Sequence, residues 1–234
     1  MNRSVKFFLS LLVILSGFGF SDVVGKAIVR SISLDAWIWP VEDKKDGQIT
    51  IQGRSPAGGF GDSLARGDVN GDGYDDLIVG ARFVSDATLA GGEVYVLLGP
   101  LSFGKSFTVD QKAALTFRGE SGWQPQIGTY TDSGDMNGDG YDEIIFGSMT
   151  QKQVYVYAGS PEIKKDAPRS IPVSPDQFML TVTGSGGGLA ICDLNGDGYQ
   201  DLFLEELSPD LVAMVWGIFG RADLAAQNRT IHLP

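Results

Sequence analysis

Three nine-residue segments place oxygen-bearing side chains at the same positions, and this spacing is the strongest chemical signal in the sequence. Positions 1, 3, 5 and 9 are Asp, Asn or Glu, and position 7 is a tyrosine that would offer its backbone carbonyl. Several oxygens on one tight turn suit a hard cation, and Gly at position 6 permits the turn. We therefore expect up to three Ca²⁺ ions, one in each segment. The expected ligands are Asp68, Asn70, Asp72, Tyr74 and Asp76, then Asp135, Asn137, Asp139, Tyr141 and Glu143, then Asp193, Asn195, Asp197, Tyr199 and Asp201.

These segments differ from EF-hand and dockerin loops, which carry a carboxylate at position 12 and run into a helix. Position 12 here is Val79, Phe146 or Leu204. Short runs rich in β-branched and aromatic residues follow each segment and predict buried strands. A solvated acidic turn would explain a single copy, but three copies with the same polar positions favour ion sites. The tyrosine side chains at position 7 are left free for another role.

The bulk composition narrows the class of partner. The 234-residue chain has a net charge of −11. Eleven acidic residues lie in the three segments, and three bound Ca²⁺ ions would reduce the net charge to −5. The chain has no basic stripe, so we expect no nucleic-acid partner. Cys192 is the only cysteine, which excludes an intrachain disulfide, and we expect it to be a small buried residue.

Residues 1–21 have the pattern of a secretory signal peptide. Arg3 and Lys6 precede an apolar run that begins at Phe7, and cleavage is expected before Asp22. The alternative is an uncleaved anchor, but the run is short for a bilayer span of about 20 residues. We therefore expect a secreted or cell-surface protein, extracellular or periplasmic, without a transmembrane segment in the mature chain. Residues 22–47 would form an N-terminal strand or linker.

Residues 48–234 contain repeats of about 60 residues. The units are 48–114, 115–179 and 180–221, followed by the start of a further unit with a strand near 230–233. Each unit has the same order: a strand, a glycine-containing turn, the acidic loop and two more strands. The expected strands are 49–53, 77–79 and 93–99, then 115–119, 144–146 and 153–159, then 180–184, 202–204 and 211–217. This period predicts an all-β fold made of β-propeller blades.

The residues that flank the first acidic loop resemble a known family of repeats. Phe60-Gly61 before the first acidic loop and Val79-Gly80-Ala81 after it are similar to the FG-GAP repeat of integrin α-subunit N-terminal propellers and their bacterial relatives. The resemblance covers about residues 48–220, and its flanking motif changes to Ile127-Gly128 in the second unit and Ser185-Gly186 in the third. It implies Ca²⁺ binding in the loops. It does not transfer any integrin ligand site.

Three recognisable blades are too few for a ring, because propellers close with roughly four to eight. The chain is then a fragment of a longer protein, or it forms an incomplete ring that another copy or a partner completes.

Other signals in the sequence are weaker. Arg66-Gly67-Asp68 spells an adhesion tripeptide, but Asp68 would be turned toward the ion. Glu205 and Glu206 are adjacent in a strand, so they would point to opposite faces and make a poor catalytic pair.

Three functions remain open. The first is a secreted Ca²⁺-binding module that mediates adhesion by binding an extracellular protein or glycan, with no catalysis of its own. The second is a non-catalytic propeller part of a larger secreted hydrolase or lyase. The third is a purely structural surface module. His232 is the only histidine, so we expect neither a histidine-based active site nor a zinc site.

Overall fold

A computed structural model describes most of the chain. The described residues are 26–29, 49–84, 91–102, 104–119, 126–185, 187–207, 212–224 and 228–233. The expected signal peptide, residues 1–21, and most of the expected linker lie outside them. The described residues form strands and two short 3₁₀ helices, η1 (Val109–Gln111) and η2 (Pro175–Gln177), so the all-β prediction is confirmed. No helix among them is long and apolar enough to cross a membrane.

The middle of the described chain forms two five-stranded sheets with the same topology. The first contains, in spatial order, β3 (Phe60–Gly67), β4 (Asp76–Ala81), β5 (Glu93–Leu97), β7 (Ala113–Arg118) and β11 (Arg169–Pro172). The second contains β8 (Tyr130–Gly134), β9 (Glu143–Ser148), β10 (Gln153–Tyr157), β12 (Leu180–Thr183) and β16 (Arg229–His232). Four strands of each sheet form an antiparallel meander, and the fifth pairs in parallel with the outermost of them. This meander is the four-stranded blade of a β-propeller.

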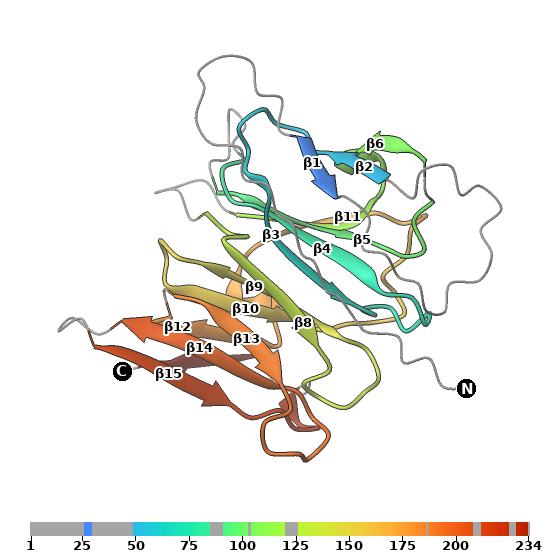
Figure 1. Ribbon diagram of the computed structural model, residues 1–234. Coiled ribbons are helices and arrows are strands. Elements are labelled where there is room, and N and C mark those ends of the chain that lie inside the picture. Colours follow the sequence, from blue (N-terminus) through green and yellow to red (C-terminus); the bar gives the residue numbers. More distant parts are fainter. Residues whose placement is uncertain are drawn as a thin grey trace, which may run out of the picture.

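A three-stranded sheet lies at each end of the described chain. One contains β1 (Lys26–Val29), β2 (Ile49–Gln52) and β6 (Ser106–Thr108), and the other contains β13 (Leu189–Cys192), β14 (Asp201–Leu207) and β15 (Ala213–Ile218). Figure 1 shows the four sheets stacked side by side, in an arc that does not close into a ring. Among the described residues, no strand pairs with the free edge of β15.

The strands that open the second and third sequence repeats pair with the sheet of the preceding repeat. The predicted strand 115–119 is β7, which forms the outer strand of the sheet that begins at β3. The predicted strand 180–184 is likewise β12, on the sheet that begins at β8. The strand expected near 230–233 as the start of a further unit is β16, but it pairs in parallel with β12, so it takes the place that β11 has in the first sheet and does not open a fourth blade. Blade boundaries in space therefore fall one strand later than the repeat boundaries in sequence.

Sequence reasoning missed five strands. Three of them, β3, β8 and β13, lie between the glycine-containing turn and the acidic loop, and the other two are β6 and β11. Ser, Asp, Arg and Gly interrupt β3 and β8, so neither segment has the continuous apolar run that marked the other strands. Their position beside the strands that follow the loops supplies the missing partner. Hydrogen bonding across the sheet, not local composition, makes these segments strands.

The core consists of apolar clusters between successive sheets. One cluster, which includes Ile51, Val79 and Tyr95, joins the first two sheets of the stack. A second surrounds Phe117 and Phe146, whose ring centroids lie 4.9 Å apart. The third joins the last two sheets and includes Met136, Leu180 and Leu202. Each fully buried side chain of this size contributes about 1.5–3 kcal/mol through the hydrophobic effect, so the inter-sheet contacts dominate the packing energy.

The glycines of the flanking motif bring two neighbouring sheets into contact. A Cβ atom at Gly80 would lie 2.2 Å from the carbonyl oxygen of Gly128, so only glycine fits there. The same carbonyl accepts a hydrogen bond of 2.9 Å from the Ser63 hydroxyl. Phe60 packs edge-on against Tyr95, with ring centroids 5.8 Å apart. Gly80 of the Gly-Ala pair therefore acts in packing between repeats, whereas Phe60 of the Phe-Gly pair packs on Tyr95 of its own sheet.

The last described sheet corrects one expectation and confirms another. Cys192 was expected to be buried, but it is exposed at the end of β13, where intermediate and exposed positions alternate. β13 contacts β8 of the neighbouring sheet, and its intermediate positions, Leu189 and Ile191, pack against the apolar cluster there. Glu205 is exposed and Glu206 is buried, as expected for adjacent residues of one strand. Glu206 accepts a hydrogen bond of 2.6 Å from the Trp216 indole N–H.

Candidate functional site

The three acidic loops occupy equivalent places in three sheets. Loop 1 (68–76) connects β3 to β4, loop 2 (135–143) connects β8 to β9, and loop 3 (193–201) connects β13 to β14. Each connection joins the first two strands of its sheet, so all three loops lie at the same end of the stack (Figure 1). The predicted side chains are therefore brought together within each loop.

The aspartate at position 1 organises each loop. Oδ1 of Asp68 accepts hydrogen bonds from the N–H groups of positions 4 and 5, at 2.8 and 3.1 Å, and Oδ2 accepts one from position 6, at 2.8 Å. Asp135 makes the same three contacts at 2.6, 3.2 and 3.0 Å. Asp193 makes them at 2.7, 3.2 and 3.0 Å. Positive φ at the glycines of positions 4 and 6 allows these N–H groups to converge on one carboxylate.

Positions 3 and 5 continue the same inward pattern. Oδ1 of Asn70 accepts the N–H of position 5 at 3.1 Å, and Oδ1 of Asp72 accepts the N–H of position 7 at 3.0 Å. The equivalent distances are 2.8 and 3.0 Å in loop 2 and 2.9 and 2.9 Å in loop 3. The side-chain oxygens thus lie on the concave side of each turn, where ligands for a cation must lie.

Position 9 ties each loop to the body of its sheet. The carboxylate of Asp76 accepts hydrogen bonds from the N–H groups of Val69, at 3.0 Å, and Gly99, at 2.8 Å. In loop 2 the longer Glu143 reaches the N–H of Met136 at 2.8 Å, so the extra methylene does not change this role. Asp201 makes the corresponding bonds in loop 3, at 3.1 and 3.0 Å.

Burial and nearby negative charge oppose ionisation at position 9 of loops 1 and 2. Burial raises the pKa of Glu143 to about 8, with the charges of Asp139 and Asp135 adding to the shift and the Met136 N–H opposing it. Burial also raises the pKa of Asp76 to about 6, against the hydrogen bonds from Gly99 and Val69. A cation bound in the loop would offset this accumulated negative charge.

The donor set suits a hard divalent cation only when its uncharged members are included. Within the described residues, no group of three or more His, Cys, Asp or Glu residues could hold a metal ion by itself. An ion in loop 1 would therefore need the amide oxygen of Asn70 and the carbonyl of Tyr74 beside the carboxylates. This mixture of carboxylate, amide and carbonyl oxygens is the chemistry that Ca²⁺ prefers.

The adhesion tripeptide is not presented as a free loop. Arg66 is exposed and forms an ion pair with Asp75. Gly67 is buried, and a Cβ atom there would lie 1.9 Å from the Ser133 hydroxyl. The carboxylate of Asp68 is turned into its own loop. This arrangement agrees with the expectation that the Asp68 carboxylate is turned inward.

Sequence reasoning missed the contacts that join one loop to the next. A Cβ atom at Gly71 in loop 1 would lie 2.5 Å from the ring of Tyr141, which is position 7 of loop 2. Tyr199 of loop 3 lies equally close to Gly138 of loop 2. The Asp142 N–H donates to the Asp68 carbonyl at 3.0 Å, and the Asp142 carboxylate accepts the Asp68 N–H at 2.8 Å. The recurrence of tyrosine at position 7 was the available signal.

Comparison with known proteins agrees with this geometry. The FG-GAP repeat family matches residues 60–97, and the FG-GAP-like repeat family matches residues 135–204. Integrin alpha-PS2 of Drosophila melanogaster is 32% identical over 201 residues, which is 77% of this chain and 13% of that protein. Integrin alpha-5 of Xenopus laevis is 31% identical over 155 residues, 63% of this chain and 14% of that protein.

A relative whose name denotes an enzyme also aligns. Phosphatidylinositol-glycan-specific phospholipase D of Dictyostelium discoideum is 28% identical over 180 residues, which is 66% of this chain and 18% of that protein. The chain thus spans less than a fifth of the length of these relatives. It is an FG-GAP repeat protein similar to integrin α-subunits, and this likeness supports an adhesion or binding module of the propeller type.

Proposed function

We propose that this protein is a secreted, Ca²⁺-binding FG-GAP propeller module that binds an extracellular protein or glycan and has no catalytic activity of its own. The observation that carries the proposal is the threefold recurrence of one loop geometry at one end of the sheet stack. The integrin relatives support a role in adhesion or binding.

Ca²⁺ would act on the fold and not on a reaction. Asp68, Asn70, Asp72, Asp76 and the carbonyl of Tyr74 would hold it in loop 1, and the equivalent residues would hold it in loops 2 and 3. When bound, the ion neutralises the carboxylates that otherwise repel one another. The carboxylate at position 9 also accepts a hydrogen bond from the backbone that follows the third strand of the sheet. An ordered loop would therefore keep the end of that strand in place.

The test is thermal unfolding of residues 22–234 in Ca²⁺ and in chelator, with molar mass measured by light scattering. A ligand that binds only the folded state stabilises it by RT ln(1 + [L]/Kd), which is about 2.7 kcal/mol at a hundredfold excess over Kd for each site. We expect a clear rise in melting temperature with Ca²⁺ and a smaller one with Mg²⁺. A variant with Asp72→Asn, Asp139→Asn and Asp197→Asn should lose most of the rise. A folded chain whose melting temperature is the same in Ca²⁺ and in chelator would refute the proposal.

The second candidate function is a non-catalytic part of a larger secreted hydrolase or lyase. The similarity to a protein named as a phospholipase D is the observation that favours it. It predicts that the full-length protein encoded by this gene cleaves a phosphatidylinositol-glycan or a polymer substrate, whereas residues 22–234 alone do not. The binding module predicts ligand retention by residues 22–234 without any product.

A further inference from the structure

A small pocket of about 220 Å³ lies outside the acidic loops, where the first two sheets of the stack meet. The connection from β5 to β6, the strand β6, the end of η1 and the connection from β10 to β11 all contribute to its wall. Three lysines, Lys105, Lys112 and Lys165, line it together with the apolar side chains of Leu98, Leu101 and Phe107. A basic pocket is unexpected on a chain whose net charge is −11.

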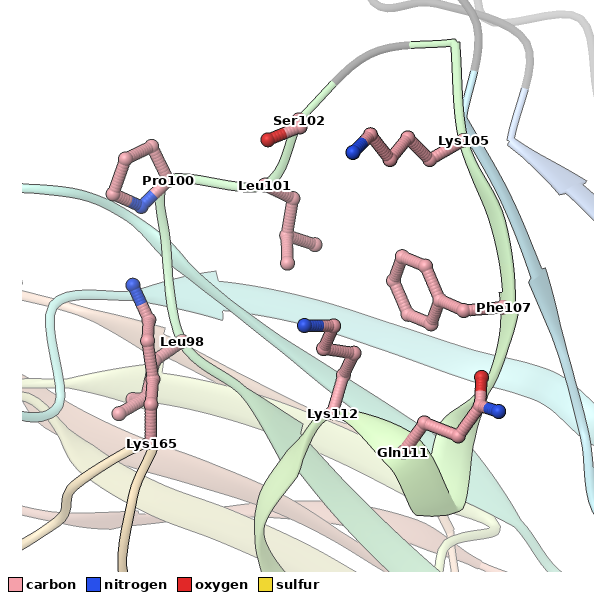
Figure 2. A pocket seen from close by; sticks show the side chains of 9 residues that line it. All are labelled: Leu98, Pro100, Leu101, Ser102, Lys105, Phe107, Gln111, Lys112 and Lys165. Atoms are coloured by element: carbon pink, nitrogen blue, oxygen red, sulfur yellow. The ribbon is translucent and has the colours of Figure 1, made fainter.

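The lysine side chains are directed at the pocket and lack acidic partners. Figure 2 shows Lys105 and Lys112 reaching toward its middle, while Lys165 rises from the opposite side. Lys165 donates a hydrogen bond to the Gly99 carbonyl. In the described part of the chain, no acidic side chain forms an ion pair with Lys105, Lys112 or Lys165. Three cationic groups around one cavity therefore have no negative charge from the described chain to balance them.

The equivalent connections in the next two repeats each contain an ion pair. In the second repeat Lys164 pairs with Glu162 at 3.2 Å, and in the third Arg221 pairs with Asp223 at 2.7 Å. The first repeat has Leu101 and Ser102 at this point and no acidic residue between Gly99 and Lys105. Lys105 belongs to this connection, whereas Lys112 follows η1 and Lys165 belongs to the connection of the second repeat, so the unbalanced charge arises where these elements meet.

The size and lining of the pocket indicate the class of ligand. Its volume is below the roughly 300–1,000 Å³ typical of sites for drug-sized ligands, so it suits one small ring or the terminal unit of a longer chain. The ammonium groups favour an anionic substituent. Phe107 and Leu101 offer an apolar surface for the C–H face of a ring, and Ser102 and Gln111 offer hydrogen-bonding groups. A peptide carboxylate alone would leave that apolar surface uncovered.

We propose that this pocket binds an anionic sugar residue, a single sugar ring that bears a sulfate or carboxylate group. The proposal gives a ligand class to the binding module proposed above and rests on it in that respect. The two sites share one structural element. The Gly99 N–H is held by Asp76 of loop 1 at 2.8 Å, and the Gly99 carbonyl accepts from Lys165, so an ordered loop 1 also positions the pocket wall.

The test is calorimetric titration of residues 22–234 in Ca²⁺ with galactose 6-sulfate, glucuronate, galactose, inorganic sulfate and a triglutamate peptide. We expect the two anionic sugars to bind at least about tenfold more tightly than galactose, because charge-assisted hydrogen bonds are the stronger ones. The double variant Lys105→Gln, Lys112→Gln should lose at least about tenfold in affinity for the sulfated sugar. Lys164→Gln, which removes an exposed lysine already paired with Glu162, is the matched control and should bind normally.

Several outcomes would overturn the proposal. Unchanged binding by the double variant would exclude the pocket, and tighter binding of inorganic sulfate or of the peptide than of the anionic sugars would exclude a sugar site. Unfolding curves of each variant confirm that a loss of binding is not a loss of fold. A chain that Ca²⁺ stabilises but that binds no sugar refutes only the pocket. A chain that binds the sugar but is not stabilised by Ca²⁺ refutes the proposed Ca²⁺ binding and leaves the proposed sugar site standing.

Discussion

Loops 1 and 3 have the same residues at positions 1, 3, 5, 7 and 9 but different surroundings. At position 2, Val69 of loop 1 is fully buried, whereas Leu194 of loop 3 is 67% exposed. The internal hydrogen bonds of the two loops are nevertheless nearly identical. The conformation of the loop and its insertion into the core are therefore separate properties.

The difference arises from the repeat that follows each loop. Tyr141 covers Gly71 of loop 1, and Tyr199 covers Gly138 of loop 2, but a Cβ atom at Gly196 of loop 3 would meet nothing within 4 Å in the described structure. The backbone of the next repeat also reaches back, since the Ser160 N–H donates to the Val69 carbonyl at 2.8 Å. Loops 1 and 2 are thus clamped between sheets, and loop 3 lies at the open end of the stack.

The largest expected effect concerns position 2. Met136 of loop 2 is fully buried in the cluster that joins the last two sheets, so Met136→Ala should destabilise the protein by about 2–5 kcal/mol. Leu194→Ala should change stability by less than about 0.5 kcal/mol, because the side chain is mostly exposed. Urea unfolding in saturating Ca²⁺ measures both. Comparable losses in the two variants would mean that loop 3 is covered in solution.

The second comparison concerns position 9. Asp76→Ala leaves the buried N–H groups of Val69 and Gly99 without partners, at about 1–3 kcal/mol each. Asp201→Ala should lower the free energy of unfolding by less than Asp76→Ala does. The difference is roughly the cost of one unpaired N–H group, because the Leu194 N–H is only partly buried and can be hydrated. Unfolding must be measured in chelator, so that loss of an ion does not contribute.

Asp76→Asn provides the control, since it keeps one acceptor oxygen and removes the charge. It should retain more stability in chelator than Asp76→Ala. Equal stability of the two variants would show that the hydrogen bonds at position 9 do not hold the loop.

A smaller effect is expected at position 4. Gly71 and Gly196 have φ of +72° and +75°, so Ala at either site should cost about 1–2 kcal/mol of backbone strain. Gly71→Ala should cost about 1–3 kcal/mol more, because its Cβ atom would lie 2.5 Å from the Tyr141 ring. Thermal unfolding of both variants, with Gly138→Ala as a second covered glycine, gives the difference. A Gly196→Ala variant as unstable as Gly71→Ala would contradict the uncovered state of loop 3.

The smallest effect isolates the tyrosine cover. In the Tyr141→Ala background, Gly71→Ala should cost only the backbone strain, as Gly196→Ala does in the normal chain. A double-mutant cycle should therefore give a coupling energy of about 0.5–3 kcal/mol between positions 71 and 141. The control is Tyr74→Ala combined with Gly71→Ala. Tyr74 is 52% exposed and is not among the atoms nearest to a Cβ at Gly71, so this pair should show almost no coupling.

Much of the fold was accessible from sequence where the signal was local. Every strand predicted after an acidic loop is present, because its apolar run is continuous and the loop marks its start. Two of the strands before the loops, β3 and β8, were missed because they have no such run. The third, β13, is apolar but only four residues long. The exposure of Cys192 was mispredicted for a related reason, since burial at β13 depends on which sheets lie on either side of it.

Local sequence is enough to specify the shape of the three acidic loops. Each is closed by hydrogen bonds that span only two to five residues, so the Asp, Asn and Gly spacing suffices to specify it. The tertiary structure alone decided which loops are clamped, which sheet receives the first strand of each repeat, and where three lysines meet around one pocket. These features join residues about 60 apart, such as Lys105 and Lys165, and depend on how neighbouring repeats stack.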